Sequence, residues 1–368
     1  MGLTTSSTGK KLLNNDFLNT ENSCDFTIAL AGNPNVGKST IFNSLTGLHQ
    51  HTGNWPGKTV ANASGVFSYN DTNFLLVDIP GTYSLMSNSQ EEEIARDYIC
   101  FGNPDVTVVV VDATCLERNL NLVYQIMELT PNVVVCVNLL DEAKKKGINI
   151  DLSKLSFLLG IPVVGTIARK QKTLNQLLLT IDKVASGELK TFPKLIKYSD
   201  EIENCIELLS PPIKEILLDN HKYLNRWICI KLFENDSKII NSISENLHIN
   251  LFNENIKNKL AICRELLRTT SDFKNTLLCS IISKCEYITL QVKNLKSNTS
   301  HTKDRKIDKI LTSKTFGIPI MLLFLGIIFW ITIVGANYPS QFLFSIFKNI
   351  ETYLIVRFRF HTFAYLAK

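Results

Sequence analysis

The sequence predicts an α/β fold in its first half, an all-helical segment after that, and one membrane-spanning helix near its end. Three observations lead to this prediction. Short β-branched runs alternate with longer helical stretches between residues 26 and 185. Gly and Pro are both missing from Ile213 to Phe316, and residues 316–335 carry no charge. We therefore divide the chain into residues 1–25, 26–186, 190–300, 316–335 and 338–368.

The α/β part contains five apolar runs of strand length. They are FTIALAG (26–32), NFLLVDIPG (73–81), DVTVVVVDA (105–113), NVVVCVNLLD (132–141) and IPVVGT (161–166). Continuous Val and Ile runs, separated by segments that suit helices, are typical of strands buried on both faces. Residues 26–186 are therefore predicted to form a parallel sheet with helices on both sides.

The segments before and after the α/β part differ from it in composition. Residues 1–25 are polar and lack the apolar stretch of a secretory signal, so we expect a flexible leader. Residues 190–300 hold apolar side chains at helical spacing, such as Ile202, Cys205, Leu208 and Leu209. Because the residues that most often break helices are rare there, this segment is predicted to be a helical domain.

The uncharged run 316–335 is twenty residues long, about 30 Å as a helix, which matches the hydrocarbon core of a bilayer. Lysines and arginines precede it in KDRKIDKILTSK (303–314), which by the positive-inside tendency keeps the preceding domains in the cytoplasm. Residues 338–368 are apolar and aromatic but interrupted by charges. They are predicted to be either a partial second membrane segment or an interfacial segment.

Composition excludes several classes of protein. Nine cysteines in 368 residues form no CxxC pair, which argues against a disulfide framework and a zinc ribbon. The formal net charge of +5 is too diffuse to indicate nucleic-acid binding. We expect no nucleic-acid partner.

A phosphate-binding loop follows the first predicted strand. The residues are Gly32, Asn33, Pro34, Asn35, Val36, Gly37, Lys38 and Ser39. A strand before this motif and a helix after it are the context that the motif requires. Its glycines let backbone N–H groups face a phosphate, Lys38 reaches the β- and γ-phosphates, and the Ser39 hydroxyl is a ligand for Mg²⁺. The fold class is therefore predicted to be a Ras-like P-loop domain.

Two further motifs favour guanine over adenine. The run Asp78-Ile79-Pro80-Gly81 ends a predicted strand, where Asp78 can hold the metal through water and Gly81 can donate its N–H to a γ-phosphate. The run Asn138-Leu139-Leu140-Asp141 ends another strand. The Asp141 carboxylate can accept two hydrogen bonds from guanine, whereas adenine would leave it unpaired.

These motifs resemble the cytoplasmic part of FeoB-type ferrous iron transport GTPases. The resemblance runs through GNPNVGKST, GNWPGKTV (53–60), DIPGTYSL (78–85), DATCLERNL (112–120) and NLLDEAKKKG (138–147). It continues in NRWICIKLFEND (225–236) and covers about residues 26–335. The resemblance implies a GTPase domain, a helical domain and a first membrane helix.

The resemblance also implies roles for single residues. In the segment with Gly57 and Lys58, Thr59 resembles the switch I threonine that closes on Mg²⁺ and the γ-phosphate. Asn35 resembles the asparagine that helps to hold K⁺ in cation-dependent members. Thr82 stands where Ras-like enzymes place a water-orienting Gln, so hydrolysis is expected to be slow and stimulated by K⁺.

A guanine-supporting loop is expected at Thr166-Ile167-Ala168, where the backbone N–H of Ala168 could meet guanine O6. Ile167 replaces the Ser that is usual in the family. Guanine specificity is expected to survive while the affinity falls.

The implied function is the GTP-binding and GTP-hydrolysing cytoplasmic module of a ferrous iron transporter in the plasma or inner membrane. Its cofactors are GTP or GDP, Mg²⁺ and K⁺. One helix cannot enclose a polar route through lipid. We therefore expect either a truncated or split chain, or a chain that works with a separate membrane chain or by self-association.

Two alternatives stay open from the sequence. One is a soluble, RNA-binding ribosome-assembly GTPase, although the glycines that a KH loop needs are missing between Glu188 and Phe316. The other is a remnant that binds nucleotide without transporting iron.

Overall fold

The computed structural model describes residues 24–47, 50–55, 60–86, 89–267, 273–295, 311, 313, 317–335 and 337–366. The chain forms two compact units, Met1–Lys296 and Ser297–Lys368, and each is described by itself. The predicted leader lies outside the described residues up to position 23, and so do Gly57, Lys58 and Thr59. The end of the α/β part at residue 186, and the limits of the helical domain at residues 190 and 300, stay predictions.

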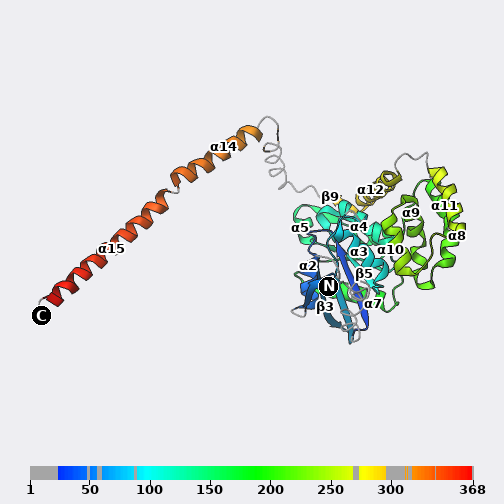
Figure 1. Ribbon diagram of the computed structural model, residues 1–368, viewed down its shortest axis with the longest axis horizontal. Coiled ribbons are helices and arrows are strands. Elements are labelled where there is room, and N and C mark those ends of the chain that lie inside the picture. The colour runs from blue at the N-terminus through cyan, green and yellow to red at the C-terminus, as the bar shows by residue number, and fades with distance from the viewer. Residues whose placement is uncertain are drawn as a thin grey trace, which may run out of the picture. The chain divides into compact units, whose positions relative to one another are not determined.

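The centre of the first unit is a seven-stranded sheet with the order β2-β3-β4-β1-β5-β6-β8. Figure 1 labels β3 and β5 of this sheet, with α2, α3, α4 and α7 around it. The strands are β1 (Phe26–Gly32), β2 (Gln50–Asn54), β3 (Ala61–Tyr69), β4 (Thr72–Asp78), β5 (Val106–Asp112), β6 (Val133–Asn138) and β8 (Val163–Gly165). Strands β4, β1, β5, β6 and β8 pair in parallel, as the sequence predicts.

The sheet is mixed, because two further strands that the sequence did not indicate join the five predicted parallel strands. Strands β2 and β3 are antiparallel to their neighbours. Asn70 and Asp71, between β3 and β4, both have positive φ angles of 48° and 62°. Two left-handed residues close a tight hairpin, which forces β3 to run against β4. Strand β2 reads QHTGN, and this polar sequence gave no sign of a strand.

Neighbouring residues of the central strands face opposite sides of the sheet, as the period of two requires. Ile28 and Leu30 of β1 belong to a core with α2 (Lys38–Thr46) and α7 (Gln171–Ala185). Ala29 and Ala31 belong to the other core, with α3 (Gln90–Phe101) and α4 (Leu116–Met127). Helices therefore cover both faces, which confirms the α/β prediction.

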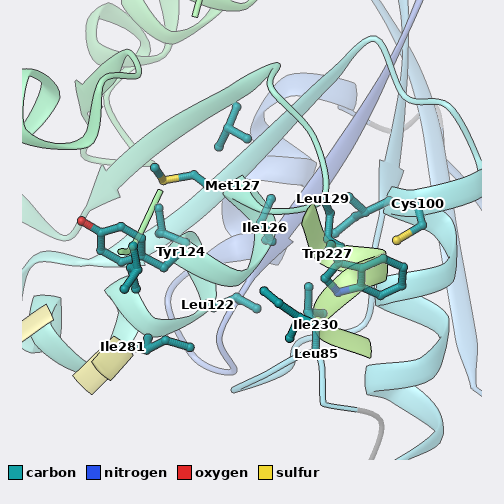
Figure 2. Close-up of a cluster of buried hydrophobic side chains, with 14 of the residues drawn as sticks. Leu85, Cys100, Leu122, Tyr124, Ile126, Met127, Leu129, Trp227, Ile230 and Ile281 are labelled. Carbon is teal, nitrogen blue, oxygen red and sulfur yellow. The ribbon is translucent and has the colours of Figure 1, made fainter. Parts of the chain in front are cut away.

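The core on the α3 and α4 side of the sheet continues into the helical segment of the first unit. The helices are α8 (Asp200–Ile216), α9 (Asn225–Glu234), α10 (Ser237–Leu247), α11 (Glu254–Leu267) and α12 (Phe273–Val292). Helix α8 packs against α9 and α11, and α12 packs against α4. Trp227 and Ile230 of α9 belong to the same buried cluster as Leu85 (Figure 2). The sheet and these helices thus share one continuous core.

Two short helices and a second small sheet complete this unit. Helix α5 (Leu140–Lys145) precedes β7 (Ile148–Ile150), and α6 (Leu152–Leu159) follows it. Strand β7 pairs antiparallel with β9 (Lys293–Leu295), which directly follows α12. The last described strand of the unit is therefore paired with the strand that follows α5.

The second unit is helical throughout its described residues from Gly317 onward. Helix α14 (Gly317–Trp330) leads into a π-helical turn at Ile331–Gly335, and α15 (Asn337–Leu366) follows. The stretch Gly317–Ile350 has a mean hydropathy of 2.6 over its most apolar window and none of that window is buried, so it is long and apolar enough to cross a membrane. The helix expected at 316–335 thus has a helical continuation in the tail 338–368.

Candidate nucleotide site

The loop between β1 and α2 has the backbone of an anion cradle. Asn35 and Gly37 both lie in the left-handed region, with φ angles of 65° and 86°. Left-handed residues next to right-handed ones turn successive N–H groups to one side, and the N-terminus of α2 adds its partial positive charge there. A Cβ on Gly32 would come within 2.7 Å of the Val110 carbonyl oxygen, so only glycine fits against β5.

Lys38 is the first residue of α2, directly after this cradle. Its Nζ forms an ion pair with Asp78 at the end of β4 and donates a hydrogen bond to the Ile79 carbonyl oxygen at 2.7 Å. Burial raises the pKa of Asp78, and the positive charge and hydrogen bond of Lys38 offset only part of this effect. The P-loop lysine and the DIPG aspartate are therefore brought together.

The segment 79–86 after β4 is anchored at several points. The Ile79 and Thr82 N–H groups donate to the carbonyl oxygens of Leu30 and Gly32, at 3.1 and 3.3 Å. Thr82 is buried. Between them, Pro80 is half-buried, and Gly81 faces the backbone of Pro34, which an added Cβ would approach to 3.5 Å. The DIPG run thus lies against the phosphate-binding loop.

The rest of this segment is anchored on helices α3 and α4. The Ser84 hydroxyl donates to Glu92 of α3 at 2.8 Å, and the Leu85 N–H donates to the Gln125 side chain of α4 at 2.7 Å. The Arg118 guanidinium lies 4.4 Å from the centre of the Tyr83 ring, in cation–π contact.

The guanine motif lies at the end of the neighbouring strand β6. Asn138 is fully buried, and its side chain donates to the Val36 carbonyl oxygen at 3.0 Å. Its Oδ1 accepts from the Ala168 N–H at 3.2 Å and from the Thr166 hydroxyl at 3.3 Å. One side chain therefore links the phosphate-binding loop to the predicted guanine loop.

The remaining residues of the motif surround the start of α5. Leu139 adopts a left-handed φ of 60° directly before α5, and Asp141 lies in the first turn of that helix. Leu140 packs over Gly165, where an added Cβ would come within 2.6 Å of the Leu140 Cδ1. The Ile167 N–H donates a hydrogen bond to the Thr173 hydroxyl at 3.1 Å. The structure thus gathers the predicted base-binding residues at one end of β6 and β8.

The candidate magnesium ligands are oxygen donors, the type that Mg²⁺ prefers. Ser39 is exposed at the start of α2, next to Lys38, and Asp78 is the ion-pair partner of Lys38. Thr59, the third predicted ligand, lies outside the described residues. The part of the chain that the structure describes contains no group of three or more His, Cys, Asp or Glu side chains suited to a metal ion.

Sequence reasoning indicated neither the burial of Asn33 nor the contact that holds Leu85. Asn33 is 2% exposed, and its amide atoms have no hydrogen-bond partner among the described residues. Gln125 holds Leu85 from forty residues away. Such contacts join residues that are distant in sequence, and no local pattern could have indicated them.

Comparison with known proteins identifies the family of this chain. The family described as ferrous iron transport protein B matches residues 26–181, and the FeoB cytosolic helical domain matches residues 198–289. The chain belongs to the FeoB family. The resemblance noted in the sequence is therefore confirmed, together with the Ras-like fold followed by a helical domain.

Among FeoB relatives, a Porphyromonas gingivalis fusion of Fe(2+) transport protein A with the Fe(2+) transporter FeoB is 35% identical over 325 residues. That alignment covers 86% of this chain and 38% of the relative. The Fe(2+) transporter FeoB of Escherichia coli K12 is 33% identical, covering 85% of this chain and 39% of the relative. The chain thus spans about two fifths of the length of these FeoB proteins.

Solved FeoB structures match about three quarters of the chain. A point mutant of S. thermophilus NFeoB bound to GDP has a TM-score of 0.63 and 32% identity, covering 73% of this chain and all of that chain. The cytosolic domain of the T. maritima FeoB iron transporter in a GDP form has a TM-score of 0.58 and 31% identity, covering 73% of this chain and 98% of that one.

Proposed function

We propose that this chain binds and hydrolyses GTP as the cytoplasmic module of a ferrous iron transporter. The observation that carries the proposal is the position of Asn138 between Val36 and Ala168. Because one buried amide joins the phosphate cradle to the base-binding loop, a nucleotide can contact both parts of a single rigid site. The GDP-bound relatives support the same assignment.

Each part of the nucleotide is assigned a protein group that can bind it. The backbone from Gly32 to Gly37 surrounds the phosphates, and Lys38 exchanges its contacts with Asp78 and Ile79 for phosphate oxygens. Asp141 accepts two hydrogen bonds from the guanine edge, and the Ala168 N–H faces guanine O6. Gly81 donates its N–H to the γ-phosphate from a segment that the Ile79 and Thr82 N–H groups already anchor to the phosphate-binding loop and β1.

Ser39 and Asp78 are proposed to hold Mg²⁺ together with Thr59, and bound Mg²⁺ stabilises the negative charge of the phosphates. The raised pKa of Asp78 fits this role, because Lys38 alone compensates its buried charge incompletely. Asn35 is proposed to help hold K⁺. Thr82, which is buried, stands where Ras-like enzymes place a water-orienting Gln, so hydrolysis is expected to be slow without such a cation.

Base recognition is tested by comparing the affinities for GDP and ADP in the presence of Mg²⁺. The parent chain should prefer GDP. Asp141→Asn should lower the GDP affinity about 100-fold or more, because two charge-assisted hydrogen bonds are lost, and should favour xanthosine diphosphate. Glu142→Gln, one residue further along α5, is the matched control. Equal affinity of the parent for GDP and ADP would overturn the proposal.

The catalytic part is tested by GTP turnover in KCl and in NaCl. We expect faster turnover in KCl, and Asn35→Ala should remove this difference. Turnover that does not depend on the cation would contradict the role of Asn35 while leaving nucleotide binding intact.

The transport role rests on the family membership and on the apolar stretch Gly317–Ile350, which we propose inserts in the plasma or inner membrane. Ferrous iron uptake is measured in cells that express this chain with and without Lys38→Ala. Uptake that Lys38→Ala abolishes supports the proposal, and parent cells without uptake favour a chain that only binds nucleotide.

A further inference from the structure

The C-terminal end of the first unit is hydrogen-bonded to the segment that follows the guanine motif. Strand β9 pairs with β7 in the register Ile148 with Leu295, Asn149 with Asn294 and Ile150 with Lys293. The Asp151 N–H donates to the Val292 carbonyl oxygen at 3.0 Å, which extends the ladder by one pair. Hydrogen-bonded pairs alternate along antiparallel strands, so Asn149 and Asn294 are also such a pair.

Side chains strengthen the same junction. Val292 is fully buried and Ile150 is 8% exposed, and both belong to the core that contains α4 and α12. Lys154 of α6 donates a hydrogen bond to Gln291 of α12 at 3.1 Å. The strand that leads out of the first unit is therefore fixed to the β7 region by backbone and side-chain contacts together.

Strand β7 is directly linked to the proposed base site. Helix α5, which carries Asp141, ends at Lys145, and a turn at Lys146 and Gly147 leads into β7. A helix of this length has little stability of its own, so its flanks determine its position. One flank is the buried Asn138 side chain, and the other is the β7–β9 ladder.

A second contact joins β7 to the guanine loop. Leu140 of α5 and Leu152 of α6 come before and after β7 in the chain, and both face Gly165 of β8. A Cβ on Gly165 would lie 2.6 Å from the Leu140 Cδ1 and 2.5 Å from the Leu152 Cδ1. Gly165 directly precedes Thr166 of the guanine loop. A shift of β7 would therefore disturb both sides of the base site.

We propose that the β7–β9 ladder couples guanine recognition at Asp141 to the chain segment that leads toward the apolar helix α14. This inference rests on the proposed GTP-binding function. The chain leaves the first unit directly after β9. A movement of β9 would therefore act first on β7, its pairing partner, and on α5, which precedes β7. By thermodynamic reciprocity, guanine binding stabilises the ladder to the same extent that the ladder strengthens guanine binding.

The first experiment compares GDP and inosine diphosphate on the full chain in detergent. Hypoxanthine lacks the 2-amino group, one of the two guanine donors assigned to Asp141, so the ratio of the two dissociation constants reports this contact. Asn294→Pro removes the N–H opposite Asn149 and should reduce the preference for GDP at least about fivefold. Asn294→Ala keeps that N–H, and Asn294 is exposed, so this control should keep the preference.

Two results would overturn the coupling. One is a folded Asn294→Pro variant with the parental preference for GDP. The other comes from hydrogen exchange on the parent chain, which needs no substitution. Saturating GDP should slow exchange of the amides at residues 148–150 and 293–295 more than saturating inosine diphosphate does, and equal protection contradicts the proposal. A parent chain that binds GDP no better than ADP would instead refute the proposed function.

Discussion

The Asn138 side-chain amide donates a hydrogen bond to the Val36 carbonyl oxygen at 3.0 Å, across 102 residues of sequence. Asn138 ends β6, and Val36 lies in the turn before α2. The amide oxygen of the same side chain accepts from the Ala168 N–H at 3.2 Å. Because Asn138 is fully buried, no water replaces these bonds when they are lost.

Asn138→Ala should therefore destabilise the chain by about 3 kcal/mol, since it leaves a buried carbonyl oxygen and a buried N–H without partners. Thermal unfolding in detergent measures this loss. Asn132→Ala is the control, because the Asn132 side chain donates one hydrogen bond to the Asp105 carbonyl oxygen at an exposed position. Similar losses in the two variants would show that Asn138 does not hold the loops together.

A substitution at Gly37 should act on the same contact from the opposite side. A Cβ there would lie 2.4 Å from the Asn138 Nδ2, whereas at Gly47 no atom lies within 4 Å. Both glycines have positive φ, 86° and 61°. Gly47→Ala, at a ψ of −129°, therefore reports backbone strain without a clash, whereas Gly37→Ala, at a ψ of 20° in the αL region, adds a clash with Asn138 to a milder strain. We expect a larger fall in melting temperature and in GDP affinity for Gly37→Ala; equal effects would argue against the clash.

Much of the fold and site could be predicted because the decisive signals are local. The phosphate-binding loop needs left-handed and close-packed positions, and Gly32 and Gly37 occupy two of them. Asp78 and Asn138 could be placed together because each ends a parallel strand, and such ends meet at one edge of the sheet. The family's motifs then indicated the guanine loop at Thr166 to Ala168.

Other features depend on contacts between distant residues. The hairpin of β3 and β4 follows from left-handed Asn70 and Asp71, but β2 is polar and gains its structure only by pairing with β3. The β7–β9 ladder joins three-residue strands that lie far apart in sequence. No window of sequence contains both partners of such a pair, so periodicity could not predict it.

A partly buried polar network also joins residues that are distant in sequence, and it gives two pH-dependence predictions of opposite sign. Glu128, directly after α4, accepts a hydrogen bond from the Tyr198 hydroxyl at 2.7 Å. Arg226 of α9 forms two hydrogen bonds with Glu203 of α8, at 2.6 and 2.7 Å, and lies 5.3 Å from the centre of the Tyr198 ring. The two carboxylates therefore share neighbours, but the Arg226 guanidinium donates its hydrogen bonds to Glu203.

Burial raises the pKa of Glu128 more than Tyr198, Arg226 and Lys231 lower it. The folded chain thus binds this proton more readily than the unfolded chain, so the stability contributed by Glu128 is lost as the pH rises through the raised pKa. Glu128→Gln cannot ionise and still accepts from Tyr198. Its melting temperature relative to the parent should increase between about pH 5 and pH 8. A difference that does not change with pH would contradict this assignment.

Glu203 should show the reverse dependence. Burial acts to raise its pKa, but the hydrogen bonds from Arg226 and from the Tyr198 N–H, together with the Arg226 charge, outweigh burial and lower it. The stability that ionised Glu203 contributes is therefore present above the ordinary glutamate pKa and is lost as the pH falls through the lowered one. Glu203→Gln should melt below the parent at neutral pH, and this gap should narrow below about pH 4.5. Glu201→Gln, on an exposed position of the same helix, is the control for charge removal near the N-terminus of α8. If the Glu203→Gln gap persists unchanged at low pH, packing rather than the ionised pair with Arg226 accounts for the loss.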